Sequence, residues 1–114
     1  MKKLFYRLRK KIVRSYGNDI DYKTMQSMIR KNSEIIVIDV RTKDEYNDKH
    51  IQGAVNIPLQ DIAEKIGNIT KSKSDIIVLY CEYGGRSRKA LNKLEKLGYV
   101  NVYNLDGGIE KILT

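Results

Sequence analysis

Residues 76–97 read IIVLYCEYGGRSRKALNKLEKL, and this stretch decides the fold. Its first five residues form a continuous apolar run, which is typical of a strand buried on both faces of a parallel sheet. Cys81 ends this run, and a short loop with the adjacent glycines Gly84 and Gly85 follows. Apolar residues then recur at helical spacing over residues 86–97, and Gly98 is placed to stop the helix. The stretch therefore predicts a strand, a tight glycine loop and a helix.

Other stretches of the chain have helical patterns. Asp21 is placed to cap a helix over residues 22–31. Thr42 and Glu45 have the spacing of a capping box, which predicts a short helix after them. Apolar residues at helical spacing predict another helix over residues 59–66. The side chains expected to face inward from these helices and from the helix after Cys81 are Met25, Met28, Ile29, Leu59, Ile62, Ala63, Ile66, Ala90, Leu91, Leu94 and Leu97.

Three more strands are expected. Residues 35–38 are a continuous β-branched run, which predicts a second buried strand, and residues 54–57 read as a short strand closed by Pro58. A last strand is expected over residues 100–105, followed by a turn at 106–108 and a short terminal helix. Because strands alternate with helices, the pattern predicts an α/β domain of three layers, with a mainly parallel central sheet and helices on both faces.

Basic charge is concentrated at the start of the chain of 114 residues. Residues 1–16 hold seven Lys and Arg and no acid, whereas the rest of the chain holds fifteen basic and fourteen acidic residues. We therefore divide the chain into a basic amphipathic segment, residues 1–17, and one domain, residues 18–114. The domain lacks the broad basic surface of a nucleic-acid binder, so no nucleic-acid partner is expected.

The basic segment can be drawn as an amphipathic helix, and its apolar runs are too short for a signal-peptide core or a membrane span. We expect it to pack on the domain or to fray. The alternative is a weak contact of residues 1–16 with a membrane surface or an anionic partner. A single cysteine permits no internal disulfide, which favours a cytoplasmic protein.

Cys81 is the strongest candidate for a reactive group. In an open α/β sheet, sites form outside the carboxyl ends of the strands, and Cys81 stands at such an end. Gly84 and Gly85 let the loop curl so that backbone N–H groups point at the sulfur, an environment that favours the thiolate. Arg86 closes the loop with a cation suited to an oxyanion, and Ser87 could cap the helix or donate its hydroxyl. A lone cysteine and histidine offer no metal site.

The length of the loop separates two chemistries. Cysteine phosphatases place five residues between the cysteine and the arginine of the loop, whereas four separate Cys81 from Arg86. A shorter loop forms a smaller ring, which suits one sulfur bound to Cys81 better than a tetrahedral phosphate. The spacing therefore favours sulfur transfer over phosphate transfer.

Five motifs then resemble one family in the order that the family has them. They are DVR at 39–41, EY at 45–46, HIQGAVNIP at 50–58, CEYGGRS at 81–87 and LDGG at 105–108. Together they make the chain similar to a single-domain rhodanese, a rhodanese-like sulfurtransferase, over about residues 19–114. The family often has a tryptophan after the paired glycines, and this chain has Ile109 there.

The resemblance implies a sulfurtransferase with the rhodanese-like α/β fold and no metal or organic cofactor. The Cys81 thiolate would take the outer sulfur of a small donor, thiosulfate or a persulfide, and pass it to a thiol or cyanide acceptor. Arg86 would attract an anionic donor, and the chain's only cysteine could not resolve the persulfide internally. The expected active-site loop is Cys81, Glu82, Tyr83, Gly84, Gly85, Arg86 and Ser87.

The remaining motif residues are given supporting roles. Asp39 and Arg41 are expected to form a structural pair that braces the loop, Glu45 either to extend that pair or to cap its helix, and His50 to belong to a turn. Glu82 would repel anionic donors, and Tyr83 would line the mouth of the site. A non-catalytic binding or regulatory module and, less favoured, a cysteine phosphatase or arsenate reductase stay open as alternatives.

Overall fold

The computed structural model describes residues 17–113 of the chain, without the side chain of residue 113. The predicted amphipathic segment therefore lies outside the described residues. The helices are α2 (Tyr22–Lys31), α3 (Lys43–Asp48), α4 (Ile62–Lys65), α5 (Gly85–Lys96) and α6 (Gly108–Leu113), and the strands are β1 (Asp19–Ile20), β2 (Ile36–Asp39), β3 (Val55–Asn56), β4 (Ile77–Tyr80) and β5 (Val102–Leu105). Within this part of the chain, no helix combines the length and the apolarity needed to cross a membrane.

The five strands form one sheet in the order β1-β5-β4-β2-β3, and every described pair is parallel. β4 lies between β2 and β5, with Leu79 opposite Ile38 on one side and Asn104 on the other. Parallel pairing puts the carboxyl ends of these strands at one edge of the sheet. The predicted α/β architecture is confirmed, and all of the sheet is parallel.

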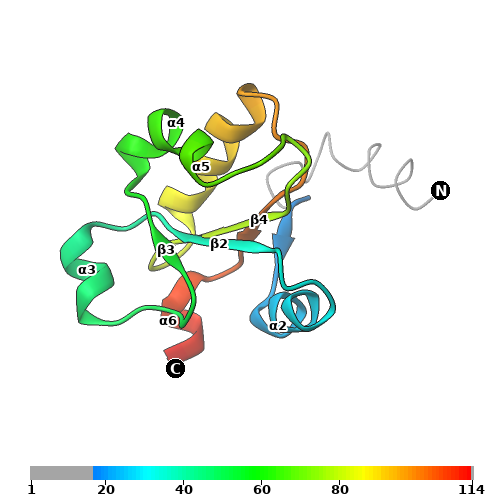
Figure 1. The fold of residues 1–114 in the computed structure, drawn as a ribbon. Coiled ribbons are helices and arrows are strands. Elements are labelled where there is room, and N and C mark those ends of the chain that lie inside the picture. The colour runs from blue at the N-terminus through cyan, green and yellow to red at the C-terminus, as the bar shows by residue number, and fades with distance from the viewer. Residues whose placement is uncertain (1–16, 114) are drawn as a thin grey trace.

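Helices cover both faces of the sheet, with α4 and α5 on one side and α2 and α6 on the other (Figure 1). The alternation of side chains along β4 explains this arrangement. Ile77 and Leu79 belong to the buried cluster under α5, whereas Val78 and Tyr80 belong to the cluster that includes Met25 of α2. A strand with apolar side chains in both directions needs a cover on both faces, which is what its continuous apolar run predicts.

Local signals set several element boundaries as predicted. Asp21 caps α2 by accepting a hydrogen bond from the Thr24 backbone N–H at 2.7 Å. Thr42 and Glu45 form both halves of a capping box at the start of α3. Gly98 takes a φ of +100° directly after α5, a conformation that glycine accepts without strain.

Some predicted elements differ from those observed. Residues 59–66 are predicted as one helix, but the structure divides them among a 3₁₀ turn, the four-residue α4 and the start of a second 3₁₀ turn. Ile62 and Ile66 are buried as predicted, whereas Ala63 is exposed.

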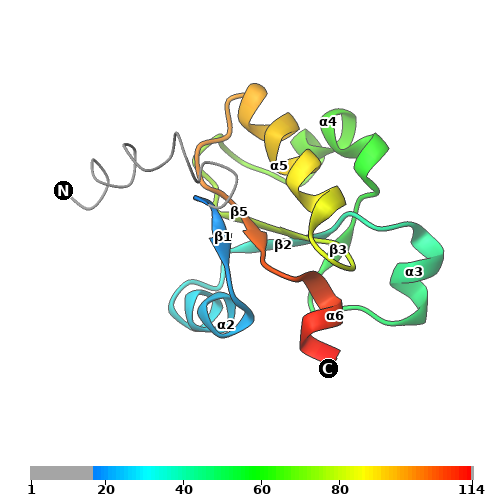
Figure 2. The ribbon, with the colours of Figure 1, turned by 180° about the vertical axis from the view of Figure 1, so that it is seen from behind.

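Two predicted element ends and one predicted inward side chain also differ from the structure. The helix predicted over residues 86–97 ends at Lys96, and the strand predicted over residues 100–105 begins at Val102. Leu97 is 40% exposed because it caps α5 beyond the last packed turn, and Val100 is 69% exposed before β5 begins. Ile29 lies at the margin of the inward face of α2 and is exposed. The two-residue β1 was not predicted, because a pair so short carries no periodic signal; it lies beside β5 at the edge of the sheet (Figure 2).

Candidate active site

Cys81 follows β4 directly, and the loop after it leads within four residues to the start of α5. The cysteine is 2% exposed and belongs to the buried cluster under α5. The neighbouring β2 ends at Asp39, which lies opposite Tyr80 in the register. The loop thus lies where the carboxyl ends of the central strands meet the amino end of a helix, a common location for anion sites.

Backbone N–H groups surround the sulfur. The Gly84 N–H donates to the Cys81 Sγ at 3.1 Å and the Ser87 N–H at 3.4 Å. Gly84 has a φ of +114°, a conformation that a residue with a Cβ rarely adopts, and this turn of the chain brings its N–H over the sulfur. The Ser87 Oγ lies 3.4 Å from Sγ as a third polar neighbour. The two N–H groups stabilise negative charge on the sulfur.

Arg86 forms an ion pair with Glu45 of α3. Its Nη1 and Nη2 donate to the two carboxylate oxygens at 2.8 and 2.9 Å. These hydrogen bonds are the main reason that the pKa of Glu45 falls to about 2, and they also raise the pKa of Arg86. Glu45 thus caps its helix and also reaches the loop. The contact of Arg86 with a donor stays a prediction. In the structure the Arg86 guanidinium is paired with Glu45, so a donor anion would have to compete with this carboxylate.

Backbone hydrogen bonds join the start of α6 to the loop. The Ile109 N–H donates to the Cys81 carbonyl at 2.9 Å, and the Glu110 N–H donates to the Glu82 carbonyl at 3.0 Å. Gly108 makes this approach possible, since a Cβ there would overlap both carbonyl groups. Gly108 of the LDGG motif therefore lets α6 bond the loop, a role beyond that of a turn residue. Ile109, where the family often has tryptophan, is buried against the sheet.

Asp39 and Arg41 form a buried pair at the end of β2. The Arg41 Nη2 donates to Asp39 at 2.7 Å and to the Lys49 carbonyl at 2.6 Å. The amide of Asn56 donates to the carbonyl oxygens of both residues. These contacts hold the segment between α3 and β3. Support for the Cys81 loop itself stays a prediction.

His50, which is predicted to belong to a turn, lies in the same segment between α3 and β3. Its ring stacks on Tyr46 with the centroids 3.8 Å apart, and its Nδ1 donates to the Tyr46 carbonyl at 2.8 Å. In the loop, Glu82 is half-buried, whereas Tyr83 is 70% exposed. An exposed aromatic side chain beside the sulfur loop can contact an incoming substrate.

The sequence interpretation did not include Asn104, which the structure places beside the loop. Asn104 is buried at the end of β5, and its Oδ1 accepts the hydroxyl proton of Ser87. Its Nδ2 donates to Asp19 of β1 at 2.9 Å, and Asp19 also accepts from Arg88. A signal was present, because Asn104 is a polar residue at a strand position where apolar residues are expected.

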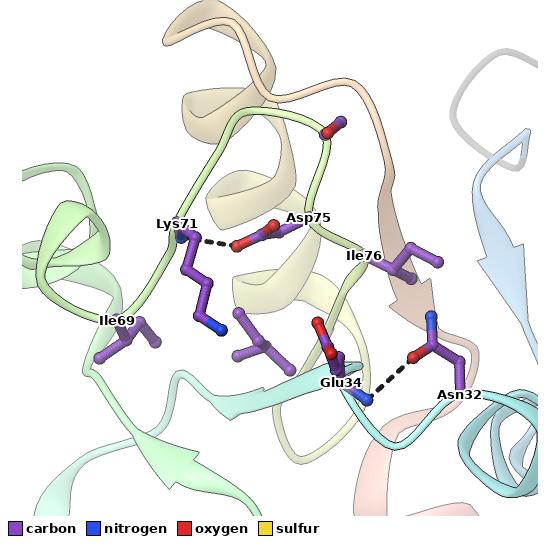
Figure 3. Close-up of a pocket in the computed structure, with 8 residues that line it drawn as sticks. Asn32, Glu34, Ile69, Lys71, Asp75 and Ile76 are labelled. Carbon is purple, nitrogen blue, oxygen red and sulfur yellow. Dashed lines mark hydrogen bonds between the residues drawn. The ribbon is translucent and has the colours of Figure 1, made fainter.

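Two of the pockets in the described part of the chain lie at opposite edges of the sheet. A pocket of about 510 Å³ borders the loop and is lined by Tyr83, Gly84, Lys89 and Asn92, among others. Another, of about 330 Å³, lies before β2 and β4 at the amino ends of the strands (Figure 3). There the side chains of Asn32 and Asp75 bond the backbone of their own turns. The first pocket therefore borders the loop that follows Cys81, although Cys81 itself is not among the residues that line it.

Comparison with known proteins identifies the family. The rhodanese-like domain family matches residues 21–114. Thiosulfate sulfurtransferase PspE of Escherichia coli is 40% identical over 75 residues, which are 66% of this chain and 71% of PspE. Thiosulfate sulfurtransferase GlpE of Coxiella burnetii is 31% identical over 80 residues, 70% of this chain and 73% of GlpE.

A solved structure described as a rhodanese with anions from E. coli has a TM-score of 0.63 and 37% identity. The match covers 67% of this chain and 89% of that one. The chain therefore belongs to the rhodanese-like domain family, and it is an enzyme of the sulfurtransferase class.

Proposed function

We propose that this protein moves a sulfane sulfur from a small donor to a thiol or cyanide acceptor through a persulfide on Cys81. The observation that carries the proposal is the buried sulfur at the end of β4, which accepts hydrogen bonds from the Gly84 and Ser87 N–H groups. These hydrogen bonds favour a nucleophilic thiolate. Cys81 is also the only cysteine in the chain, so no other thiol competes for the donor.

The reaction has two displacements. The Cys81 thiolate attacks the outer sulfur of the donor, the new S–S bond forms, and the donor's own bond to that sulfur breaks. Its electron pair leaves with sulfite, when thiosulfate is the donor, or with a thiolate. An acceptor thiolate or cyanide then attacks the outer sulfur, and Cys81 departs as the thiolate. No net oxidation of the enzyme occurs, and splitting the transfer lowers each barrier.

The charge around the sulfur favours donors whose sulfur group carries less negative charge than the thiosulfate dianion. Glu82 contributes an acid to the loop, and Glu45 pairs with Arg86 through two hydrogen bonds. A thiosulfate dianion therefore meets little positive potential as it approaches. We expect a persulfide donor to be used more efficiently than thiosulfate, although both deliver the same outer sulfur.

Mass spectrometry of the intact protein tests the proposal. After incubation with thiosulfate or a low-molecular-weight persulfide, the protein should gain one sulfur atom, and cyanide or a thiol should remove it. The Cys81→Ser variant should gain none. If the wild-type protein gains no sulfur from any sulfane donor, the proposed function is wrong.

Two further parts of the proposal concern the cell. We place the protein in the cytoplasm, because the chemistry needs Cys81 as a free thiol and a reducing compartment maintains it. Cell fractionation with an antibody checks this location.

We also propose that residues 1–16, with seven basic residues, give a weak contact with an anionic surface. Deleting this segment should abolish that contact and leave sulfur loading intact.

A further inference from the structure

A chain of hydrogen bonds leads away from the sulfur of Cys81 into the protein. Ser87 and Asn104, which follow it, are 0% and 3% exposed. The Ser87 Oγ lies 3.4 Å from the Sγ and bonds the Oδ1 of Asn104, whose Nδ2 bonds Asp19 at 2.9 Å. Asp19 ends the chain at the guanidinium of Arg88. Each of these groups is buried or half-buried, so bulk water does not compete freely for their bonds.

The direction of each proton follows from the last partner. Asp19 is paired with Arg88 and is therefore an ionised carboxylate that can only accept hydrogen bonds. The Asn104 side chain must then point its Nδ2 at Asp19 and its Oδ1 at Ser87. The Oδ1 can only accept, so Ser87 gives it the hydroxyl proton. The other close acceptor of that hydroxyl, the Gly84 carbonyl at 3.1 Å, cannot return a proton either.

Ser87 consequently presents lone pairs to the sulfur. It can accept a hydrogen bond from the thiol form of Cys81, but it cannot donate one to the thiolate while Asn104 holds its proton. Turning the hydroxyl toward the sulfur would leave the buried Oδ1 of Asn104 without a donor, which is unfavourable. Negative charge on Sγ is thus stabilised by the Gly84 and Ser87 N–H groups and opposed by the Ser87 oxygen.

We propose that Asn104 is a positioning residue that, by holding the Ser87 hydroxyl proton, favours the uncharged forms of the Cys81 sulfur over the free thiolate. The proposal rests on the proposed persulfide function. When the donor sulfur binds, Sγ loses its charge and the outer sulfur carries it. When the acceptor removes the outer sulfur, the charge returns to Sγ. Asn104 therefore favours the sulfur-loaded state and slows its discharge.

The test replaces Asn104 by leucine, which has nearly the same shape and no acceptor. The freed Ser87 hydroxyl should then turn to the thiolate, because hydrogen bonds to charged acceptors are stronger than those to a carbonyl. Alkylation of the resting protein by iodoacetamide at neutral pH should become about threefold to tenfold faster. The loaded protein should also lose its outer sulfur to cyanide faster, by a similar factor.

Asn101→Leu is the matched control, since Asn101 also lies next to β5 but bonds the Ser74 carbonyl at the far end of the sheet. It should leave both rates unchanged. The decisive variants carry Ser87→Ala alone and with Asn104→Leu. If Asn104 acts through the Ser87 hydroxyl, its replacement should change neither rate once that hydroxyl is absent.

An equal effect of Asn104→Leu with and without the hydroxyl would overturn the proposal, as would unchanged or slower alkylation in the single variant. The alkylation rate needs no sulfur transfer, so it decides this proposal even if the wild-type protein never carries a persulfide. The charged groups around the sulfur stay the same in every variant, and the pH profile of alkylation can be compared directly. These groups are Glu82, Arg86, Arg88, Asp19, Glu45 and Glu110.

Discussion

At the scale of single residues, Glu82 adds a negative charge to the loop that a donor approaches. It follows Cys81 directly, and the nearby cation of Arg86 is ion-paired with Glu45. Replacing Glu82 by glutamine removes one negative charge with little change in shape. We expect kcat/KM with thiosulfate to rise about threefold at low salt, and the increase to shrink as salt screens the charge. Steady-state assays at two ionic strengths measure this effect.

The Glu82 prediction has two controls. An organic thiosulfonate, which gives up its outer sulfur and releases a sulfinate, should show a smaller rise in kcat/KM, because it carries one negative charge where thiosulfate carries two. Glu34→Gln removes the same charge at the opposite edge of the sheet, beside the pocket of Figure 3, and should leave thiosulfate turnover unaltered. An equal gain with both donors would show that Glu82 acts on the chemistry and not on donor charge.

Gly108 is the residue where a single methyl group should do the most damage. Its φ is +65°, and a Cβ would overlap the carbonyl groups of Cys81 and Glu82. Gly108→Ala should lower the free energy of unfolding by about 3 kcal/mol, because strain and overlap add. Gly53 also has a positive φ, +89°, but open space around it, so Gly53→Ala should cost only about 1 kcal/mol. Urea denaturation of both variants measures the difference in the free energy of unfolding. Equal losses would mean that the positive φ alone, and not overlap with the loop, causes the destabilisation.

Sequence reasoning predicted the residues of the loop but not those that support it. Cys81, the glycines and Arg86 are contiguous, so their spacing is readable from the chain. Asn104 and Gly108 act on the same loop from distant positions, and only the folded sheet brings them there. The polar side chain of Asn104 in a buried strand was visible, but its partner was not.

At the scale of elements, α3 is joined to the loop by one side chain. The Oε1 of Glu45 accepts from the Thr42 backbone at 2.9 Å and from Arg86 at 2.8 Å. The pKa of Glu45 is lowered from 4.5 to about 2, chiefly by the Arg86 hydrogen bonds. A lowered pKa means that the pair contributes stability above pH 4.5, and that this contribution is lost as the pH falls toward 2.

Glu45→Gln tests this linkage, since glutamine can keep the capping box but not the ion pair. The pair is partly exposed, so we expect a loss of about 1 kcal/mol at neutral pH, well below the full linkage value. The difference between wild type and variant should shrink as the pH drops below 4.5. Urea unfolding at several pH values measures it. A difference that stays constant with pH would mean that the variant disturbs packing and not charge.

The elements that the sequence predicted well are those with strong local signals. The continuous apolar runs became β2 and β4, and the caps at Asp21 and Thr42 start α2 and α3. Residues 59–66 misled because helical spacing alone does not show that the chain must tighten into 3₁₀ turns where α4 meets α5. Tertiary contacts override a pattern of this length.

At the scale of the whole molecule, the parallel sheet explains why the motifs are dispersed along the chain. Parallel strands bring their carboxyl ends to one edge, so residues after β2, β4 and β5 meet there. Each connection must return across a face of the sheet, which supplies the helices of both outer layers (Figure 1). The loop of Cys81 is therefore held from three directions, by Glu45 of α3, by Asn104 of β5 and by the start of α6.

Charge is divided unequally over the whole chain, and this division predicts separable activities. Residues 1–16 carry seven basic residues, whereas the remainder is nearly neutral. Each basic residue near an anionic lipid surface contributes about 1 kcal/mol, so the full chain should bind vesicles containing anionic phospholipid and release them at high salt. A chain of residues 17–114 should not bind these vesicles. It should still gain one sulfur, because the described sheet and the family match both begin after residue 16.

Replacing Lys10 and Lys11 by glutamine in the full chain makes the test quantitative. Losing two charges should weaken vesicle binding by about tenfold or more, with no change in the rate of sulfur loading. Co-sedimentation with anionic and with neutral vesicles gives the affinity, and mass spectrometry gives the loading. Binding to neutral vesicles, or binding that survives high salt, would mean that apolar contacts recruit the protein. Slower loading in the shortened chain would instead assign residues 1–16 a part in the site of Cys81.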